Sequence, residues 1–456
     1  MTTIDSLIIF GFSTDSIKDY TGRLIFDPIN GCYIEFLGEM PTNYMGREFL
    51  LYGKTANLQL FTAVKCFTPS VLHFYQQHKI HINKLFLGIC DSEIEQLEIS
   101  EIFFRTSYLE HWFGFLPLKY NEDIYSINTK DLIFNDEIQY SESFKLKFPH
   151  EWNTDTIKNK QFIFNLNRLI SISSNKPKSL DLFERETFKT LNLFKILSPT
   201  NSIYLEECFF YFNEKKVEIL QKKGFYQQED NTVNWTDFLV LYNEETNKKL
   251  ITNWFNQYNK FGLIFDYIYT VFNEQATPIA ETQFLFQMQW IEGFCREKFS
   301  IEQSEQEAFD TLVSNLKQNF NNDSEEYKWI DKNTKYYKSS FLKHLKKLFT
   351  ELKDKKYVDF SRLERNLICM KIKTLRDELT HLEGNRKTYQ LQELSHINDL
   401  LKGIIIFSIM NELEIPINSE NLGTNRIISQ YTFALKLLCQ KKRILKRKTL
   451  TSKPKK

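Results

Sequence analysis

One stretch near the C-terminal end decides the fold of that half of the chain: Lys371-Ile-Lys-Thr-Leu-Arg376-Asp377-Glu378-Leu379-Thr380-His381-Leu382-Glu383-Gly384-Asn385. It closes a helical pattern that starts near Ser361, in which apolar residues recur at steps of three and four and predict one apolar helix face. These apolar residues are Leu363, Leu367, Ile368, Ile372, Leu375, Leu379 and Leu382. Because Gly384-Asn385 is a C-terminal stop signal, we expect a long amphipathic helix with His381 in its last turn.

Three residues of this predicted helix have side chains suited to catalysis. His381 can act as a base or an acid, because imidazole titrates near neutrality. Asp377 precedes it by four residues, so its carboxylate is expected to reach the imidazole and fix the tautomer. Arg376 can bind a phosphate with its planar guanidinium and stabilise developing negative charge. We therefore treat Arg376, Asp377 and His381 as the candidate catalytic residues.

The spacing of Arg376 and His381 limits what a single helix can do. Five residues correspond to about 500° of rotation, so the two positions lie about 140° apart around a regular helix. One histidine also cannot easily serve as both acid and base in one reaction. A two-fold dimer that brings two such helices together would supply both groups, so we expect a homodimer or a higher homo-oligomer.

The pattern Arg376-Asp377-x-x-x-His381 resembles the nuclease motif of HEPN domains, and the length and surroundings resemble the ApeA-like HEPN proteins, which are bacterial anti-phage factors. A second element, Leu109-x-x-Trp112, resembles part of their N-terminal domain; for its role we favour an aromatic core anchor and use the element only as a marker of the family. The resemblance implies a metal-independent endoribonuclease that acts in abortive infection. It also implies that cellular RNA is the substrate, with tRNA as one candidate, and that no cofactor is needed.

The same resemblance implies 2′,3′-cyclic phosphate products, an unknown phage-derived trigger, and an N-terminal region that senses or regulates. Basic residues around the motif could bind RNA phosphates, or they could be a solvated charged face. The candidates for RNA binding are Arg365, Lys373, Arg386 and Lys387. A rival interpretation is a non-catalytic HEPN protein that dimerises through its helices and recognises a phage or host partner. A similar spacing occurs at Arg105 and His111, where the surroundings do not predict a long helix.

The whole chain predicts an α+β multidomain protein. Residues 1–275 are expected to form a β-rich, sandwich-like region, with a possible break near residue 150, because short apolar runs alternate with turn signals such as Asn30-Gly31. Residues 276–440 are expected to form an all-α HEPN bundle in which 321–328 is a loop. Residues 441–456 form a basic tail.

Composition gives predictions about charged partners, disulfides, metal sites and membrane spans. The net charge is +1, yet eleven basic and no acidic residues follow Glu420, which predicts either a polyanion contact or a solubility tail. The seven cysteines are scattered and form no C-x-x-C pair, which argues against disulfides and a zinc ribbon. The cluster of His73, His78 and His81 lacks further ligands, so we expect no metal site. The longest apolar run is far too short to span a membrane, and we expect a cytoplasmic protein.

Overall fold

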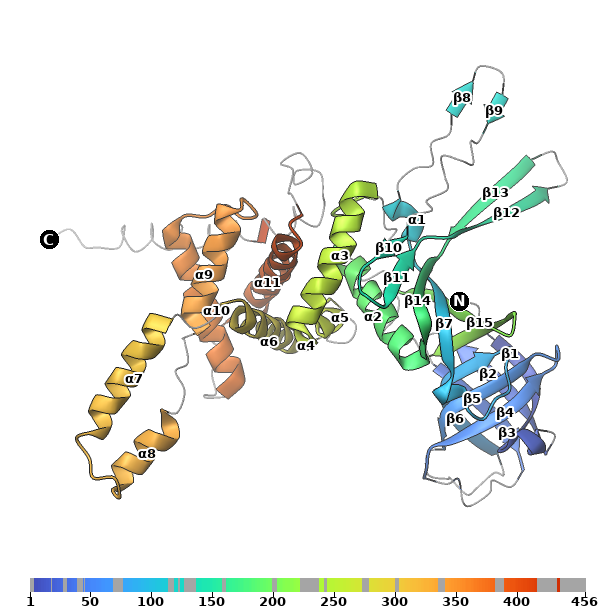
Figure 1. Ribbon diagram of the computed structural model, residues 1–456, viewed down its shortest axis with the longest axis horizontal. Helices are drawn as coiled ribbons and strands as arrows, with labels where there is room; N and C mark the ends of the chain where they lie inside the picture. Colours follow the sequence, from blue (N-terminus) through green and yellow to red (C-terminus); the bar gives the residue numbers. More distant parts are fainter. Residues whose placement is uncertain are drawn as a thin grey trace. The chain divides into compact units, whose positions relative to one another are not determined.

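The computed structural model divides into two compact units, Met1–Lys260 and Phe261–Lys456 (Figure 1). It describes residues 4–415 and 433–434. The gaps are 18, 28–30, 39–43, 45, 69–76, 114–118, 122–123, 127–136, 158–160, 199–202, 222–237, 242–243, 273–278, 300–302, 335–340 and 382–388. Residues 416–440 of the predicted bundle, apart from 433–434, and the basic tail therefore lie outside the described residues.

Six antiparallel strands of the first unit close into a barrel. Their order is β6-β3-β2-β1-β4-β5, and β5 pairs with β6 to complete the circle. The strands are β1 (Ile4–Gly11), β2 (Tyr20–Asp27), β3 (Gly31–Leu37), β4 (Phe49–Thr55), β5 (Leu60–Phe67) and β6 (Gln77–Leu87). Alternate residues point inward, so that Cys32, Ile34 and Phe36 of β3 join the apolar interior. The turn signal at Asn30-Gly31 separates two strands that pair antiparallel, since Asp27 of β2 pairs with Gly31 of β3, whose φ of 97° suits glycine.

The sheet continues beyond the barrel through one shared strand. After pairing with β3, strand β6 pairs with β16, and the order then runs β16-β15-β7-β14-β11-β10. These strands are β7 (Glu98–Thr106), β10 (Ile138–Gln139), β11 (Phe144–Lys147), β14 (Ile170–Ser179), β15 (Leu205–Phe212) and β16 (Lys215–Gln221). Two separate hairpins are β8 (Lys119–Asn121) with β9 (Ile124–Ser126), and β12 (His150–Ile157) with β13 (Gln161–Arg168). The predicted β-rich region is thus confirmed, as a barrel with added strands where a sandwich-like form was expected.

Helices complete the core of the first unit. They are α1 (Leu109–Trp112), α2 (Leu180–Leu197) and α3 (Glu244–Phe261). Trp112 is fully buried, and its ring centroid lies 5.0 Å from that of Phe194 on α2 and 5.5 Å from that of Phe148. The Leu109-x-x-Trp112 element is therefore an aromatic core anchor.

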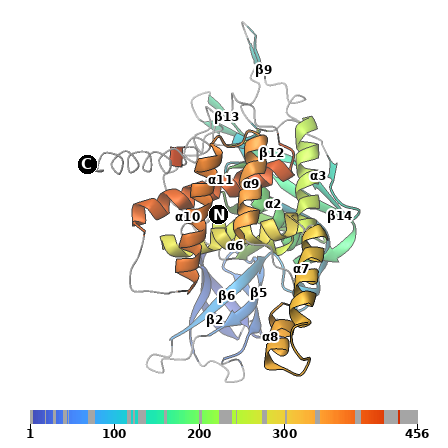
Figure 2. The same cartoon turned by 90° about the vertical axis from the view of Figure 1, so that its left-hand side faces the viewer.

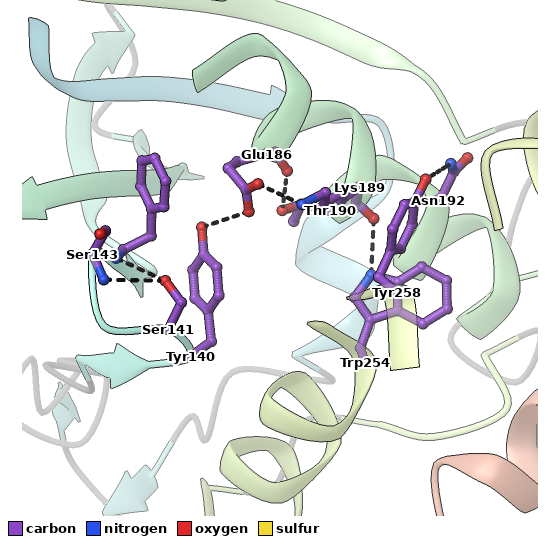
Figure 3. Close-up of polar contacts among 10 residues, drawn as sticks. Tyr140, Ser141, Ser143, Glu186, Lys189, Thr190, Asn192, Trp254 and Tyr258 are labelled. Carbon is purple, nitrogen blue, oxygen red and sulfur yellow. Dashed lines mark hydrogen bonds and ion pairs between the residues drawn. The ribbon is translucent and has the colours of Figure 1, made fainter. Parts of the chain in front are cut away.

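Polar contacts tie α2 to its neighbours in the same unit (Figure 3). The Trp254 indole on α3 donates to the Lys189 carbonyl at 3.0 Å, and the Tyr140 hydroxyl after β10 donates to Glu186 at 3.2 Å. Lys189 also binds the other Glu186 oxygen at 2.6 Å. Tyr140 and Glu186 are both buried, so water cannot reach their polar groups. These bonds supply the hydrogen-bond partners that water would otherwise provide.

The second unit is helical. Its helices are α4 (Leu263–Asp266), α5 (Ile268–Val271), α6 (Ala280–Lys298), α7 (Gln303–Lys317), α8 (Glu325–Asn333), α9 (Phe341–Asp354), α10 (Arg362–His381) and α11 (Leu391–Glu412). Helices α6, α9, α10 and α11 pack together (Figure 2). The predicted loop at 321–328 is wrong in its second half, because α8 begins at Glu325, where the Ser324 side chain accepts from the Tyr327 amide. None of the described helices combines the length and apolar character needed to cross a membrane.

Helix α10 buries one face and exposes another. Ile368, Cys369, Ile372 and Leu375 are buried, as the sequence pattern predicts for the apolar ones. Leu363 is different: its side chain is 58% exposed, on the opposite side of the helix, so its assignment to the buried face is wrong. Two sets of apolar residues lie on different faces of α10. Both sets recur at steps of three and four, so the spacing alone does not show which set is buried.

Candidate functional site

Helix α10 runs without interruption through the predicted motif. It starts with a reciprocal cap, in which the Glu364 amide donates to the Ser361 hydroxyl at 3.2 Å and the Ser361 amide donates to the Glu364 carboxylate at 2.9 Å. Near its end the Thr380 hydroxyl donates to the Arg376 carbonyl at 2.7 Å. The helix includes residue 381, so positions 376 and 381 lie about 140° apart around its axis.

Arg376 is held between three helices. Its Nε lies 2.8 Å from Oε1 of Glu292 on α6, and its Nη1 donates to Oδ1 of Asp377 at 3.1 Å. The guanidinium carbon lies 5.9 Å from the ring centroid of Phe341 on α9. Burial lowers the pKa of Arg376, but the hydrogen bonds to Asp377 and Glu292 outweigh burial and raise this pKa above its ordinary value. The result is a positioned cation whose side chain is still 31% exposed.

Asp377 links two of the predicted site residues. Its Oδ2 accepts a hydrogen bond from Nζ of Lys373 at 2.6 Å, while its Oδ1 accepts from Arg376. The bond from Lys373 is the main cause that lowers the pKa of Asp377, so the carboxylate is ionised at neutral pH. The His381 side chain lies outside the described residues, and the expected contact between Asp377 and His381 stays a prediction.

Glu292 is a member of this cluster that sequence reasoning did not identify. It lies beside the buried face of α6, next to Ile291, and nothing in its spacing connects it with Arg376. A carboxylate flanking an apolar helix face is the only signal in the sequence, and it is common to many surface helices. The pair is created by the packing of α6 against α10.

Two family models cover most of the chain. The model described as ApeA N-terminal domain 1 matches residues 9–254, and the model described as Apea-like HEPN matches residues 285–418. The chain belongs to the ApeA-like HEPN family. At the level of the family, this membership supports an HEPN nuclease in anti-phage defence. No match was found among the curated proteins or among the solved structures.

The matched HEPN segment contains the whole cluster of Glu292, Arg376 and Asp377, together with His381. HEPN domains are generally ribonucleases, and they typically dimerise and act on RNA. The described residues contain no group of three or more His, Cys, Asp or Glu side chains arranged to hold a metal ion. All six cysteines with described positions are free thiols.

The predicted RNA-binding residues of this HEPN domain have different surroundings. Lys373 lies beside the Arg376 cluster, with its side chain 44% exposed. Arg365 lies between helices, where its Nη1 donates to the Thr350 hydroxyl of α9. Arg386 and Lys387 lie outside the described residues. Only Lys373 is therefore brought next to the motif arginine among the candidates that can be described.

Proposed function

We propose that this HEPN protein is a metal-independent endoribonuclease that cleaves cellular RNA, with tRNA as one candidate, during abortive infection. The observation that carries the proposal is the fixed guanidinium of Arg376, five positions before His381 in one unbroken helix of an HEPN domain. Glu292 and Asp377 hold its Nε and Nη1. An arginine fork held in this way is pre-organised for a phosphate oxygen.

The proposed reaction is an internal transfer at the RNA phosphate. The 2′-oxygen bonds to phosphorus while the bond from phosphorus to the 5′-oxygen breaks. A base removes the proton of the 2′-OH and an acid gives a proton to the leaving 5′-oxygen, and His381 can serve in either role. Arg376 stabilises the additional negative charge on the phosphorane. The products are a 2′,3′-cyclic phosphate and a 5′-hydroxyl.

A second copy of the chain would complete this site. Positions 376 and 381 point to different sides of α10, and the reaction uses two proton-transfer groups. The face of α10 that contains residue 381 also exposes Leu363 and Met370, whose side chains are 58% and 48% exposed. Leu363 and His381 are eighteen residues apart, or about five turns, so they lie on one side of the helix. An apolar stripe that leads to the catalytic histidine fits a two-fold contact between two α10 helices.

In this proposal Asp377 and Glu292 are positioning residues. Both hold Arg376, and Asp377 would also orient His381 of its own helix. The N-terminal β-rich unit would sense the phage-derived trigger or restrain the nuclease.

The rival function is a non-catalytic HEPN module that dimerises and binds a phage or host partner. One observation favours it: Arg376 is ion-paired with two carboxylates, as an arginine with a purely structural role would be. The two functions differ in what His381 does. A structural bundle does not need that imidazole, whereas a ribonuclease does.

The test uses purified wild-type protein beside His381→Ala, with His396→Ala as the matched control on α11. We expect wild type and His396→Ala to cut RNA in the presence of EDTA and to leave 2′,3′-cyclic phosphate ends. We expect no cutting by His381→Ala. During phage challenge, total RNA should show new cuts only in cells with an active variant. Equal activity of His381→Ala and wild type, or activity that EDTA removes and Mg²⁺ restores, would contradict the proposal.

A further inference from the structure

Helix α7 buries very little of its own surface. It packs against α8 (Figure 1), and no other described helix packs extensively on either of the two. None of the side chains from 306 to 317 is buried, and among the described side chains of α8 only Ile330 is. Helices of this length are marginal in water and take most of their stability from the packing of an apolar face. A further surface is therefore expected to cover α7.

The uncovered face of α7 is apolar. Leu312 and Leu316 follow each other at a step of four, and Phe320 comes four residues later, just after the helix ends. Their exposed fractions are 58%, 42% and 38%. We call these three residues the α7 stripe. Neighbouring α8 is held in place by an ion pair, in which Nζ of Lys317 lies 2.6 Å from Oδ1 of Asp331. Contiguous exposed apolar side chains of this kind mark a binding surface.

The charge around the α7 stripe determines what can cover it. Residues 303–333, the α7–α8 hairpin, contain seven acidic and three basic residues, a formal charge of −4. Three of the carboxylates, those of Asp323, Glu325 and Glu326, are exposed where the chain enters α8. Like charges repel, so this surface disfavours both RNA and the same hairpin of a second copy. The cover that fits the stripe is apolar and basic.

The chain itself contains a segment of this kind. Ten basic residues and no acidic residue follow Ala434, and apolar residues lie among them: Leu435, Leu437, Leu438, Ile444, Leu445 and Leu450. Ala434 is 2% exposed and belongs to the same compact unit as the hairpin, so the segment starts from a packed position in that unit. The 22 residues from 435 to 456 span about 70 Å when extended, against about 40 Å for the diameter of a compact domain of this size. The segment is therefore long enough to reach the stripe.

We propose that the C-terminal segment, residues 435–456, docks on the α7 stripe of its own chain. Its leucine and isoleucine side chains cover Leu312, Leu316 and Phe320, and its lysines and arginines lie opposite the carboxylates of the hairpin. The contact holds a polycation that would otherwise bind any nucleic acid, whatever its sequence. Docking thus stabilises α7 and limits non-specific binding of RNA by the tail.

The test is limited digestion of the full-length protein with trypsin, because the basic residues of the segment are all cleavage sites. Mass spectrometry follows the rate of cutting within residues 441–448. Leu312→Gln with Leu316→Gln should speed these cuts about tenfold, since a docked segment must detach before it is cleaved. The matched control is Leu263→Gln with Leu391→Gln, which changes two leucines of the same unit that are 75% and 61% exposed. The control should be cut as wild type is. Equal rates in wild type and in the stripe variant would overturn the proposal.

A second measurement keeps the wild-type hairpin and so does not depend on how the stripe variant folds. A carbodiimide joins carboxylates to amines that contact them, and it should link Glu325 or Glu326 to lysines of the segment. Glu325→Gln with Glu326→Gln should remove these links and speed the trypsin cuts about threefold, because two ion pairs are lost. In a mixture of ¹⁵N-labelled and unlabelled protein, both linked peptides should come from one copy. Links only between copies would make a second copy the source of the cover and overturn the contact within one chain. Links from the segment to other elements, with none to the hairpin, would overturn the docking itself.

Discussion

Arg105 in the β-rich unit and Arg376 in the HEPN unit have nearly the same electrostatic surroundings. Arg105 lies 3.0 Å from Glu206 and 3.9 Å from Glu207, and its side chain is 26% exposed. Arg376 lies 2.8 Å from Glu292 and 3.1 Å from Asp377, and its side chain is 31% exposed. Each precedes a histidine by a few residues. Pairing with two carboxylates therefore does not distinguish a structural arginine from a candidate catalytic one.

The two arginines differ in the elements that carry them. Arg105 is on strand β7 in the middle of a sheet, and His111 lies on the four-residue helix α1. Arg376 and His381 belong to one regular helix, and the face that contains residue 381 also carries an exposed apolar stripe. The two-fold contact proposed above needs an exposed apolar face next to the histidine, and α10 presents one at Leu363 and Met370.

The largest effect should come from exchanging the two arginines for alanine. We expect Arg376→Ala to lower the rate of RNA cleavage roughly 100-fold to 10,000-fold, because the charge stabilisation at the phosphate is lost. Arg105→Ala should leave the rate unchanged and should lower the stability of its own unit by on the order of 1 kcal/mol. Cleavage assays and thermal melts of both variants measure these effects. If Arg105→Ala abolished cutting and Arg376→Ala did not, Arg105 would be the catalytic arginine and Arg376 the structural one.

A second, smaller effect should follow from a charge on the exposed stripe of α10. Met370→Glu keeps a good helix former at that position, but it places carboxylates at the proposed two-fold contact. We expect the dimer to dissociate and cleavage to fall about tenfold at concentrations where the parent is dimeric. Sedimentation measures the mass and a cleavage assay measures the rate. Leu391→Glu changes a leucine at the start of α11 that is 61% exposed, against 48% for Met370, and should affect neither.

The smallest effect should be a pH dependence of stability due to Asp377. Its folded pKa is lower than the ordinary 3.8, mainly because of Lys373. A lowered carboxylate pKa contributes stability above pH 3.8, and this contribution is lost as the pH falls through the folded pKa. The side chain is 35% exposed, so solvent screening limits the contribution to less than about 1 kcal/mol. Asp377→Asn should therefore melt earlier than wild type at pH 7, and the gap should close in acid. If the difference in melting temperature were the same at every pH, lost packing would explain the destabilisation.

Local signals in the sequence predicted much of the helical unit. The cap formed by Ser361 and Glu364 and the apolar steps that follow specify where α10 begins and which residues it buries. Ser324 is an equally clear start signal for α8, but the polar run 321–328 around it predicts a loop. The apolar spacing places Leu363 on the wrong face, because two stripes of apolar residues overlap in one helix.

Local sequence signals do not predict the contacts between elements that are far apart in the chain. The alternating pattern of the first strands predicts a sheet with one apolar face, but closure of the barrel depends on the pairing of β5 with β6. The sequence of neither strand predicts that β5 and β6 pair. The ion pair of Glu292 with Arg376 has the same origin, since it exists only because α6 packs against α10.

Strand β6 has a consequence for how the first unit unfolds. Its residues pair with β3 and β5 inside the barrel, and its last four residues also pair with β16 of the added strands. If β6 detached from the barrel or from the added strands, its hydrogen bonds to the other part would break as well. The barrel and the added strands should therefore melt as one cooperative block, with the slowest amide exchange in β6. A fragment cut after Leu87 would keep every barrel strand yet expose the edge that β16 covers, and it would be prone to aggregate through that edge.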